Sequence, residues 1–263
     1  MTGPVPTPPD ATPPHGLLAG KTVIVTAAAG TGIGFATAKR CAEEGARLCI
    51  SDLHERRLRE SADALAEVAG ELPVALLCDV TDGAQIRALI HGAIDALGHI
   101  DVLVNNAGLG GFAPVVEMSD EQWHRVLDVT LHSTFRMTRE VLPHMLERGR
   151  GAIVNNASVL GWRAQKGQAH YAAAKAGVMA FTRCAALEAA ESNVRINAVA
   201  PSLAMHEFLS KVTPDGLLQE LVGREAFGRA AEPFEIANVI VFLASDYASY
   251  MTGEVLSVSS QHP

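Results

Sequence analysis

Ser158, Tyr171 and Lys175 lie in one segment, with thirteen residues from the serine to the tyrosine and four from the tyrosine to the lysine. The alanine-rich run around Tyr171 favours a helix, and positions i and i+4 share one helix face. A phenol ordinarily titrates near ~10, and an adjacent cation lowers its pKa. The pair could therefore move a proton to or from an oxygen. Alternatively, the ring packs and the lysine extends along a surface helix.

A second candidate site is the glycine-rich turn in "VIVTAAAGTGIGFATAKR". The pattern predicts a strand, a turn of small residues and a helix. Gly30, Gly32 and Gly34 allow close approach of the backbone to a bound group, and a helix N-terminus favours a pyrophosphate. Methyltransferases use similar turns, but the position between the first strand and first helix of a βαβ unit favours dinucleotide binding.

Asp52 ends the next expected strand, eighteen residues beyond Gly34. A carboxylate there can accept hydrogen bonds from the adenosine ribose and would repel a 2′-phosphate, so the sequence predicts NAD rather than NADP. Arg56 and Arg57 follow in "DLHERR" and could soften that preference. The alternative role for Asp52 is a turn residue or helix N-cap.

Composition narrows the class of protein. The net charge of -8 argues against nucleic acid as the main partner. No run reaches the ~18 uninterrupted apolar residues of a membrane span, which argues against a membrane protein. The four cysteines show no CxxC spacing and the ten histidines are scattered, so we expect no metal site. We expect buried thiols in a reducing cytoplasm. The proline-rich residues 1–16 predict a flexible tail.

Seven short, mostly apolar runs alternate with helical segments from residue 21 to residue 260. Continuous apolar runs are typical of strands covered on both faces, and strand–helix alternation predicts a parallel sheet. We therefore predict a single α/β domain over residues 17–263, with a Rossmann-type, doubly wound, seven-stranded parallel sheet. Residues 203–231 interrupt the alternation and would form a lid over the substrate.

Further motifs follow in order along the chain. "CDV" ends the third expected strand and "NNAG" ends the fourth, before Ser158, Tyr171 and Lys175. With the glycine loop, this ordered set resembles the short-chain dehydrogenase/reductase family, in its short single-domain branch. The resemblance extends from Gly20 to the last strand, because "RINAVAP" and "GRAAEPFEIANVIVFLASDYASYMTGEVLSV" also look like the family's C-terminal half.

The resemblance implies an NAD(P)-dependent oxidoreductase that interconverts a secondary alcohol and a ketone by hydride transfer. Tyr171 would be the acid/base, Lys175 would lower its pKa and bond the nicotinamide ribose, and Ser158 would orient the substrate oxygen. Ligands of open α/β sheets bind beyond the carboxyl ends of the strands, where these motifs fall. The implied cofactor-binding residues are Gly30, Thr31, Gly32, Ile33, Gly34, Asp52, Leu53, Asp79, Val80, Asn106, Ala107, Gly108, Tyr171, Lys175, Pro201 and Leu203.

The sequence departs from the family's pattern around the nicotinamide and the substrate. "TAAAGTGIG" lacks the usual glycine after Thr26, and Thr130 stands where an asparagine commonly completes a proton relay. His206 replaces a common threonine after the sixth strand, and the chain ends in "VSSQHP". His206 and Trp162, together with Ser158, are candidate substrate residues. His170, next to Tyr171, reads as an ordinary surface or interface residue.

By resemblance, substrates would include 3-oxoacyl or hydroxyacyl thioesters and steroid-derived compounds, because "NNASVLGWRAQ" and the terminus look like actinobacterial members that degrade such molecules. The alternative is a dinucleotide-sensing protein that uses the same fold without catalysis. We also expect a homodimer or homotetramer, packed through the segment "WHRVLDVTLHSTFRMTREVLPHM".

Overall fold

The protein folds around one parallel β-sheet in the computed structural model, which describes residues 6–205 and 215–261. Its seven strands run in the order β3-β2-β1-β4-β5-β6-β7, which confirms the predicted fold class. The order reverses between β1 and β4, and ligands of such sheets bind beside that reversal. The strands are β1 (Thr22–Thr26), β2 (Arg47–Asp52), β3 (Val74–Leu77), β4 (Val102–Asn105), β5 (Gly151–Asn156), β6 (Val194–Pro201) and β7 (Val255–Val258).

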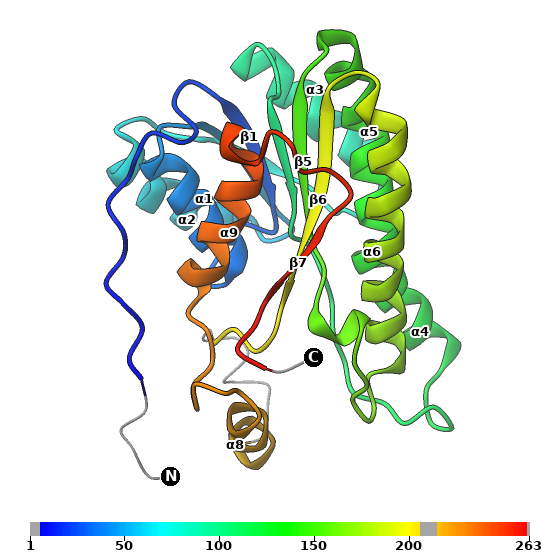
Figure 1. The fold of residues 1–263 in the computed structure, drawn as a ribbon. Helices are drawn as coiled ribbons and strands as arrows, with labels where there is room; N and C mark the ends of the chain where they lie inside the picture. Colours follow the sequence, from blue (N-terminus) through cyan, green and yellow to red (C-terminus); the bar gives the residue numbers. More distant parts are fainter. Residues whose placement is uncertain (1–5, 206–214, 262–263) are drawn as a thin grey trace.

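Helices cover both faces of the sheet (Figure 1). One layer contains α1, α2 and α9, and the other contains α3, α5 and α6. The ends of β5 and β6 lead into η2 and toward α8 at the same edge of the sheet. The helices are α1 (Ile33–Glu43), α2 (Glu55–Ala69), α3 (Gly83–Leu97), α4 (Asp120–Leu127), α5 (Ser133–Arg148), α6 (Ala169–Ala190), α8 (Asp215–Gly223) and α9 (Pro233–Ala244), with short helical turns η1 (Asp128–His132), η2 (Val159–Gly161) and η3 (Asp246–Ala248).

The hydrophobic core lies on the two faces of the central strands. β1 and β4 are buried along their whole length, which explains their uninterrupted apolar sequences. On one face, Leu65 of α2 and Ile240 of α9 pack in the same cluster, and on the other Ile90 of α3 packs with Met137 of α5. The edge strand β3 alternates between partly buried and exposed residues, because successive side chains point to opposite faces and Val74 and Leu76 pack on the cluster that includes α3.

The structure divides residues 120–149 into three helical pieces. α4 ends at Leu127, η1 is a π-helical turn over Asp128–His132, and α5 continues from Ser133. Such π turns inside helices occur often at functional sites, because the extra residue re-aims a side chain. Here the turn carries Thr130, which faces the loop after β4.

The proline-rich segment makes specific contacts before the expected domain boundary at residue 17. The Arg40 guanidinium donates to the Thr12 carbonyl at 2.6 Å. The Glu44 carboxylate accepts from the amides of His15 and Leu17, each at 2.9 Å, and pairs with Arg40 at 2.5 Å. From Thr12 onward, the segment expected to be a flexible tail is therefore held against α1.

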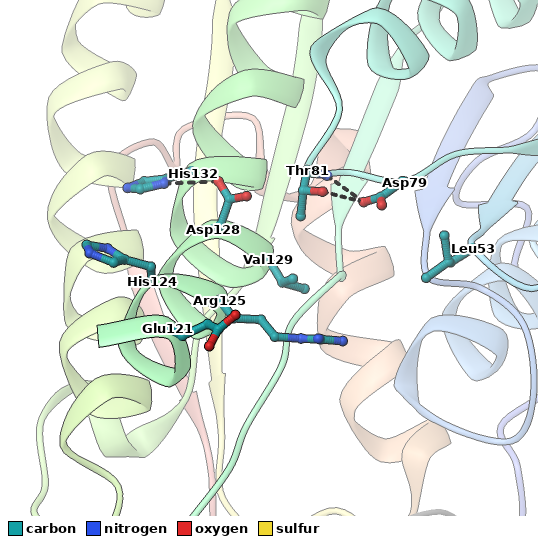
Figure 2. Close-up of a pocket in the computed structure, with 9 residues that line it drawn as sticks. All are labelled: Leu53, Asp79, Thr81, Glu121, His124, Arg125, Asp128, Val129 and His132. Atoms are coloured by element: carbon teal, nitrogen blue, oxygen red, sulfur yellow. Dashed lines mark hydrogen bonds and ion pairs between the residues drawn. The ribbon is translucent and has the colours of Figure 1, made fainter. Parts of the chain in front are cut away.

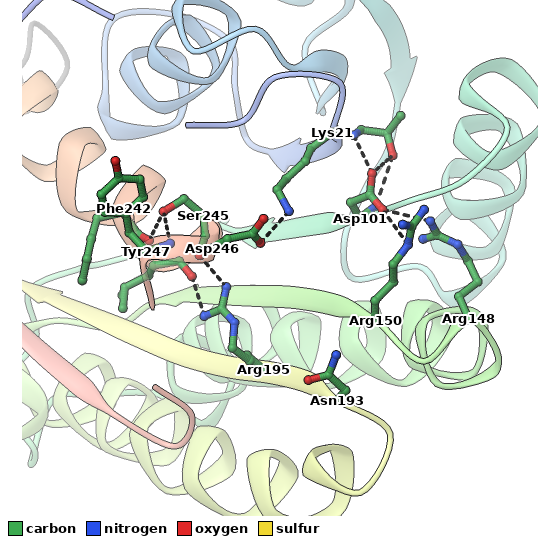
Figure 3. Close-up of polar contacts among 12 residues, drawn as sticks. Lys21, Asp101, Arg148, Arg150, Asn193, Arg195, Phe242, Ser245, Asp246 and Tyr247 are labelled. Atoms are coloured by element: carbon green, nitrogen blue, oxygen red, sulfur yellow. Dashed lines mark hydrogen bonds and ion pairs between the residues drawn. The ribbon is translucent and has the colours of Figure 1, made fainter. Parts of the chain in front are cut away.

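Charged side chains tie the loops together at the amino ends of the strands (Figure 3). Asp101 accepts from the Thr22 amide at 3.0 Å and pairs with Arg148 at 2.9 Å. Arg195, at the start of β6, donates to the carbonyls of Leu243 at 2.8 Å and Ser245 at 3.0 Å. This end of the sheet is cross-linked by groups that satisfy one another.

The structure also bears on membrane spans, metal sites and cysteines. No helix in the described ranges is long and apolar enough to cross a membrane. Over the same ranges, no group of three or more His, Cys, Asp or Glu side chains is placed to hold a metal ion. All four cysteines are free, and Cys41, Cys49 and Cys78 are buried. The prediction that all are buried is wrong for Cys184, because α6 turns this residue outward on the face that also carries exposed Leu187.

Candidate active site

The glycine loop connects β1 to α1 as the sequence predicts. Gly30 has φ +94°, which favours glycine, and a Cβ added there would meet nothing within 4 Å. At Gly34 a Cβ would lie 2.2 Å from the Ala27 carbonyl oxygen and 2.4 Å from Asn106 Nδ2, so a side chain cannot fit. Gly32 is the N-cap of α1 and has no side chain to cap the helix. The first amides of α1 are thus available to an anion.

Asp52 lies at the carboxyl end of β2, next to this loop. Its carboxylate accepts from the Ala29 amide at 3.3 Å and the His54 amide at 3.0 Å, and Arg57 lies 3.9 Å away. Burial raises the pKa of Asp52, while the Ala29 amide and Arg57 act in the opposite direction. Arg56 pairs instead with Glu60 at 3.0 Å, on the exposed face of α2.

Paired asparagines join the ends of β4 and β5, where "NNA" occurs twice. Asn105 lies opposite Asn155 in the sheet, and Asn105 Nδ2 donates to Asn155 Oδ1 at 2.9 Å. One position further on, Asn156 Nδ2 donates to Asn106 Oδ1 at 2.9 Å. Asn106 in turn donates to the carbonyls of Thr26 and Ala27 and so fixes the glycine loop. Asn156 was not predicted as a site residue, although the repeated "NNA" was a visible signal.

Lys175 is buried under the end of β5, with 2% of its surface exposed. Its ammonium donates to the Asn156 carbonyl at 2.5 Å. A Cβ added at Gly108 would lie 3.3 Å from Lys175 Nζ, so the loop after β4 packs directly on the ammonium. Burial lowers the pKa of Lys175 to about 8 because the charged form is desolvated.

Tyr171 and Lys175 lie on one face of α6, as predicted, with Lys175 Nζ 5.5 Å from the centroid of the Tyr171 ring. The expected lowering of the tyrosine pKa is wrong for this structure. Burial raises the pKa of Tyr171 to about 12, and a hydrogen bond with Ser158 acts against that rise. Ser158 is buried at the start of η2, where its Oγ also accepts from the Leu160 amide at 3.2 Å. The structure thus brings the serine, tyrosine and lysine together.

Thr130 is fully buried beside this group. Its hydroxyl accepts from the Leu109 amide at 3.0 Å and donates to the Leu109 carbonyl at 3.3 Å. Both bonds go to the backbone of the loop after β4. The side chain of Thr130 therefore fixes that loop instead of pointing an open hydroxyl toward Lys175.

A cavity of about 760 Å³ opens beyond the ends of β2 and β3 (Figure 2). Leu53 and Asp79, expected near the adenine, line one side of it. Arg125 extends from α4 toward Leu53 on the opposite side. The side chain of Val80 is instead buried in the core against α3. A wall formed by α4 and η1 was not predicted from the sequence; it consists of Glu121, His124, Arg125, Asp128, Val129 and His132.

The substrate side of the site is less complete. Trp162 directly follows η2 and is 51% exposed. Pro201 ends β6, with Leu203 just beyond it, and His206 lies outside the described residues. His170 was expected to be a surface or interface residue, but it is not on the surface, because only 2% of it is exposed. A Cβ added at Gly111 would lie 3.1 Å from its Nε2. α6 turns it toward the loop after β4.

These residues fit a nicotinamide dinucleotide. The open space at Gly30 and the uncapped start of α1 suit a pyrophosphate, and the Asp52 carboxylate suits a ribose. Asn156 Oδ1 is buried without a hydrogen-bond partner among the described residues, so an acceptor near Lys175 is left open. The fold, the glycine loop and the Ser–Tyr–Lys group together define a dehydrogenase of the dinucleotide-binding class.

Comparison with known proteins agrees with that class. A family model described as Enoyl-(Acyl carrier protein) reductase matches residues 27–260. The crystal structure of a short chain dehydrogenase from Mycobacterium smegmatis is 57% identical with a TM-score of 0.86, over 97% of this chain and 98% of that one. The chain therefore belongs to the short-chain dehydrogenase/reductase family, whose members use NAD(P), and it is an oxidoreductase.

Two curated relatives are similar over nearly their whole length. The (5R,7aS)-5-hydroxy-7a-methyl-1-oxo-2,3,5,6,7,7a-hexahydro-1H-indene-carboxyl-CoA reductase of Mycobacterium tuberculosis is 61% identical, over 95% of each chain. The 3-oxoacyl-[acyl-carrier-protein] reductase FabG of Thermotoga maritima is 40% identical, over 92% of this chain and 97% of that one. The predicted interconversion of an alcohol and a ketone is confirmed at the level of the family. The non-catalytic alternative gains no support from these relatives.

Proposed function

We propose that this protein is an NAD-dependent reductase or dehydrogenase that acts on a ring ketone or secondary alcohol of a coenzyme A thioester. The observation that carries the proposal is the group of buried Ser158 and Lys175 and partly buried Tyr171 at the carboxyl edge of the sheet. A bound nicotinamide would supply or accept the hydride. The high identity to a CoA reductase supports the thioester class.

The protein's own groups would handle the proton. With its pKa raised to about 12, Tyr171 is a neutral phenol at pH 7 and can donate a proton to a developing alkoxide. Ser158 would hold the same oxygen by a second hydrogen bond. Lys175, charged below a pKa of about 8, would stabilise negative charge on the phenol after it has given up its proton.

The rim of the site supports an apolar substrate. Several large apolar side chains are exposed on the segments that follow β4, β5 and α8. Exposed apolar surface concentrated at a mouth is typical of a ligand-binding rim. The exposed residues on these segments are Phe112, Val115, Val116, Trp162 and Phe227.

Turnover of a thioester panel tests this function. We would follow NADH consumption with acetoacetyl-CoA, a bicyclic keto-acyl-CoA and the free acid of the latter. An enoyl-CoA would test the double-bond reduction named in the family model. We expect the bicyclic thioester to be the best substrate. Preference for the enoyl-CoA would assign a different reaction, and binding of NADH with turnover of no substrate would favour the sensor.

We also propose a preference for NADH over NADPH, carried by Asp52. Its carboxylate is held by two backbone amides at the end of β2, so it cannot easily turn away from a 2′-phosphate. Fluorescence titration should show at least about ten-fold tighter NADH binding, the usual worth of one charge-assisted contact. Asp52→Ala should remove most of that difference, and Asp63→Ala, an exposed change on α2, should not. Tighter NADPH binding by the unmodified protein would refute the preference.

A homodimer or homotetramer in the cytoplasm completes the proposal. Phe135 of α5 is exposed and meets Phe181 of α6 edge-on at 6.1 Å, next to exposed Cys184 and Leu187. Such a face suits a subunit interface. Free thiols fit a reducing compartment. Sedimentation of a monomer at assay concentration would contradict the oligomer.

A further inference from the structure

Glu225 is a buried carboxylate that the reaction does not use. It follows α8, and its oxygens accept from three different groups. The Leu203 amide donates to Oε1 at 3.3 Å, and the Ser260 hydroxyl donates to Oε2 at 2.8 Å. The Gln261 side chain also donates to Oε1, at 2.7 Å. Glu225 therefore joins the segment after β6 to the end of the chain.

Gln261 also contacts the loop after Ser158. The Arg163 guanidinium donates to the side-chain oxygen of Gln261, and a second nitrogen donates to its main-chain carbonyl at 3.3 Å. The Gln261 amide thus accepts from a cation on one side and donates to a carboxylate on the other. Arg163 directly follows Trp162, at the exposed rim of the site.

We propose that Arg163, Glu225 and Gln261 form a clamp that positions the Trp162 loop, and that this loop sets the wall of the substrate site. The clamp joins three segments that are far apart in sequence but meet at the carboxyl edge of the sheet: the turn after β5, the end of α8 and the C-terminal residues beyond β7. Its three members are positioning residues, because none of them belongs to the Ser–Tyr–Lys group.

The polarity of the amide makes the clamp specific. Arg163 can only donate and the Glu225 carboxylate can only accept, so the group between them must do both. The Gln261 amide does so in one orientation. Among the described residues, the Gln261 amide links the Arg163 guanidinium to the Glu225 carboxylate, whereas the nearby Arg224 and Arg229 pair with Glu220 and Glu235.

The test begins with a readout that needs no substrate. Trp162 is one of two tryptophans, so Trp123→Phe leaves it as the sole indole. In that background, Glu225→Leu removes the acceptor of the Gln261 amide, and Gln261→Glu places two carboxylates side by side. Each single change should raise acrylamide quenching of Trp162 about two-fold, because local opening exposes the ring. Glu220→Gln, an exposed change on α8, is the matched control and should not raise it.

The reciprocal double variant decides the matter. Glu225→Gln with Gln261→Glu restores one donor and one acceptor and pairs Arg163 directly with a carboxylate, so quenching should return to the unmodified value. A merely structural role for either residue predicts additive damage. Single variants that quench like Glu220→Gln, or a double variant as damaged as the singles, would overturn the clamp.

The kinetic consequence rests on the proposed function. Each single variant should raise KM for the bicyclic thioester about ten-fold, the loss expected when one well-made contact is misplaced. It should leave kcat for acetoacetyl-CoA and NADH binding nearly unchanged, because the Ser–Tyr–Lys group and the glycine loop are untouched. An equal fall in kcat for both thioesters would refute the positioning role. If the unmodified protein turns over neither thioester, the proposed function fails, while the quenching series still tests the clamp.

Discussion

The two ends of the sheet treat polar groups in opposite ways. At the amino end, Asp101 and Arg195 are surrounded by partners that satisfy them, so these groups hold the loops together (Figure 3). At the carboxyl end, Asn156 Oδ1 lacks a partner among the described residues, and Lys175 is buried as a cation with a lowered pKa. The amino end is built for stability, and the carboxyl end keeps unmet hydrogen-bonding capacity for ligands.

Removing one oxygen at the carboxyl end should have the largest effect. We expect Tyr171→Phe to reduce turnover at least about 1,000-fold, because the change removes the hydroxyl that gives the proton. NADH binding and the melting temperature should change little, since the ring remains. Steady-state kinetics and thermal denaturation check both. Tyr247→Phe, at an exposed tyrosine, is the control, and turnover retained by Tyr171→Phe would contradict the mechanism.

The second largest effect should be a loss of activity at high pH, which also arises at the carboxyl end of the sheet. The pKa of Lys175 is lowered to about 8, so its ammonium is present below that pH and is lost above it. The kcat/KM for ketone reduction should therefore fall as pH rises through about 8, approaching ten-fold for each further pH unit. The neutral Tyr171 phenol persists until about 12 and does not limit the rate first. A profile that stays flat well above pH 8 would contradict this assignment.

Breaking the amino end should change stability and leave catalysis intact. Asp101→Ala leaves the Thr22 amide without its acceptor and Arg148 without its carboxylate partner, and we expect a loss of about 2–3 kcal/mol in the free energy of unfolding. Denaturant unfolding measures this, with Asp63→Ala as an exposed control. A large fall in kcat in folded Asp101→Ala would show that the two ends are not separate.

The same carboxylate sets a pH dependence of stability. Burial alone would raise the pKa of Asp101, but the Thr22 amide and Arg148 more than offset it, so the net pKa is lowered. Its contribution is present above the unfolded-state pKa and is lost as the pH falls through the folded-state pKa. Asp101→Asn should therefore lose less stability in acid than the unmodified protein.

The smallest effect should come from Thr130, which lies at the carboxyl end but is fully bonded. Thr130→Val removes the two bonds to the Leu109 backbone and keeps the shape, so we expect turnover to fall less than about ten-fold. A loss as large as that of Tyr171→Phe would mean that the hydroxyl itself relays protons. Kinetics measured in parallel on the two variants distinguish these roles.

Much of this site could be predicted from local sequence, because the spacing of residues along one helix or one turn fixes their neighbours. Tyr171 and Lys175 share a helix face by geometry alone, and the glycine loop follows from one strand and one helix. Predictions failed where the surroundings decide. The pKa of Tyr171 depends on how deeply α6 packs, and the orientation of His170 depends on the loop after β4.

The sequence by itself determined the alternation of seven strands with helices, the family, and the positions of the serine, tyrosine and lysine. Apolar runs and short spacings encode these features directly. Only the tertiary structure decided which groups meet across the sheet: the paired asparagines of β4 and β5, the π turn that directs Thr130 to Leu109, and the clamp from Arg163 to Gln261 and Glu225. These contacts join residues distant in sequence, so local spacing alone does not specify which of them pair.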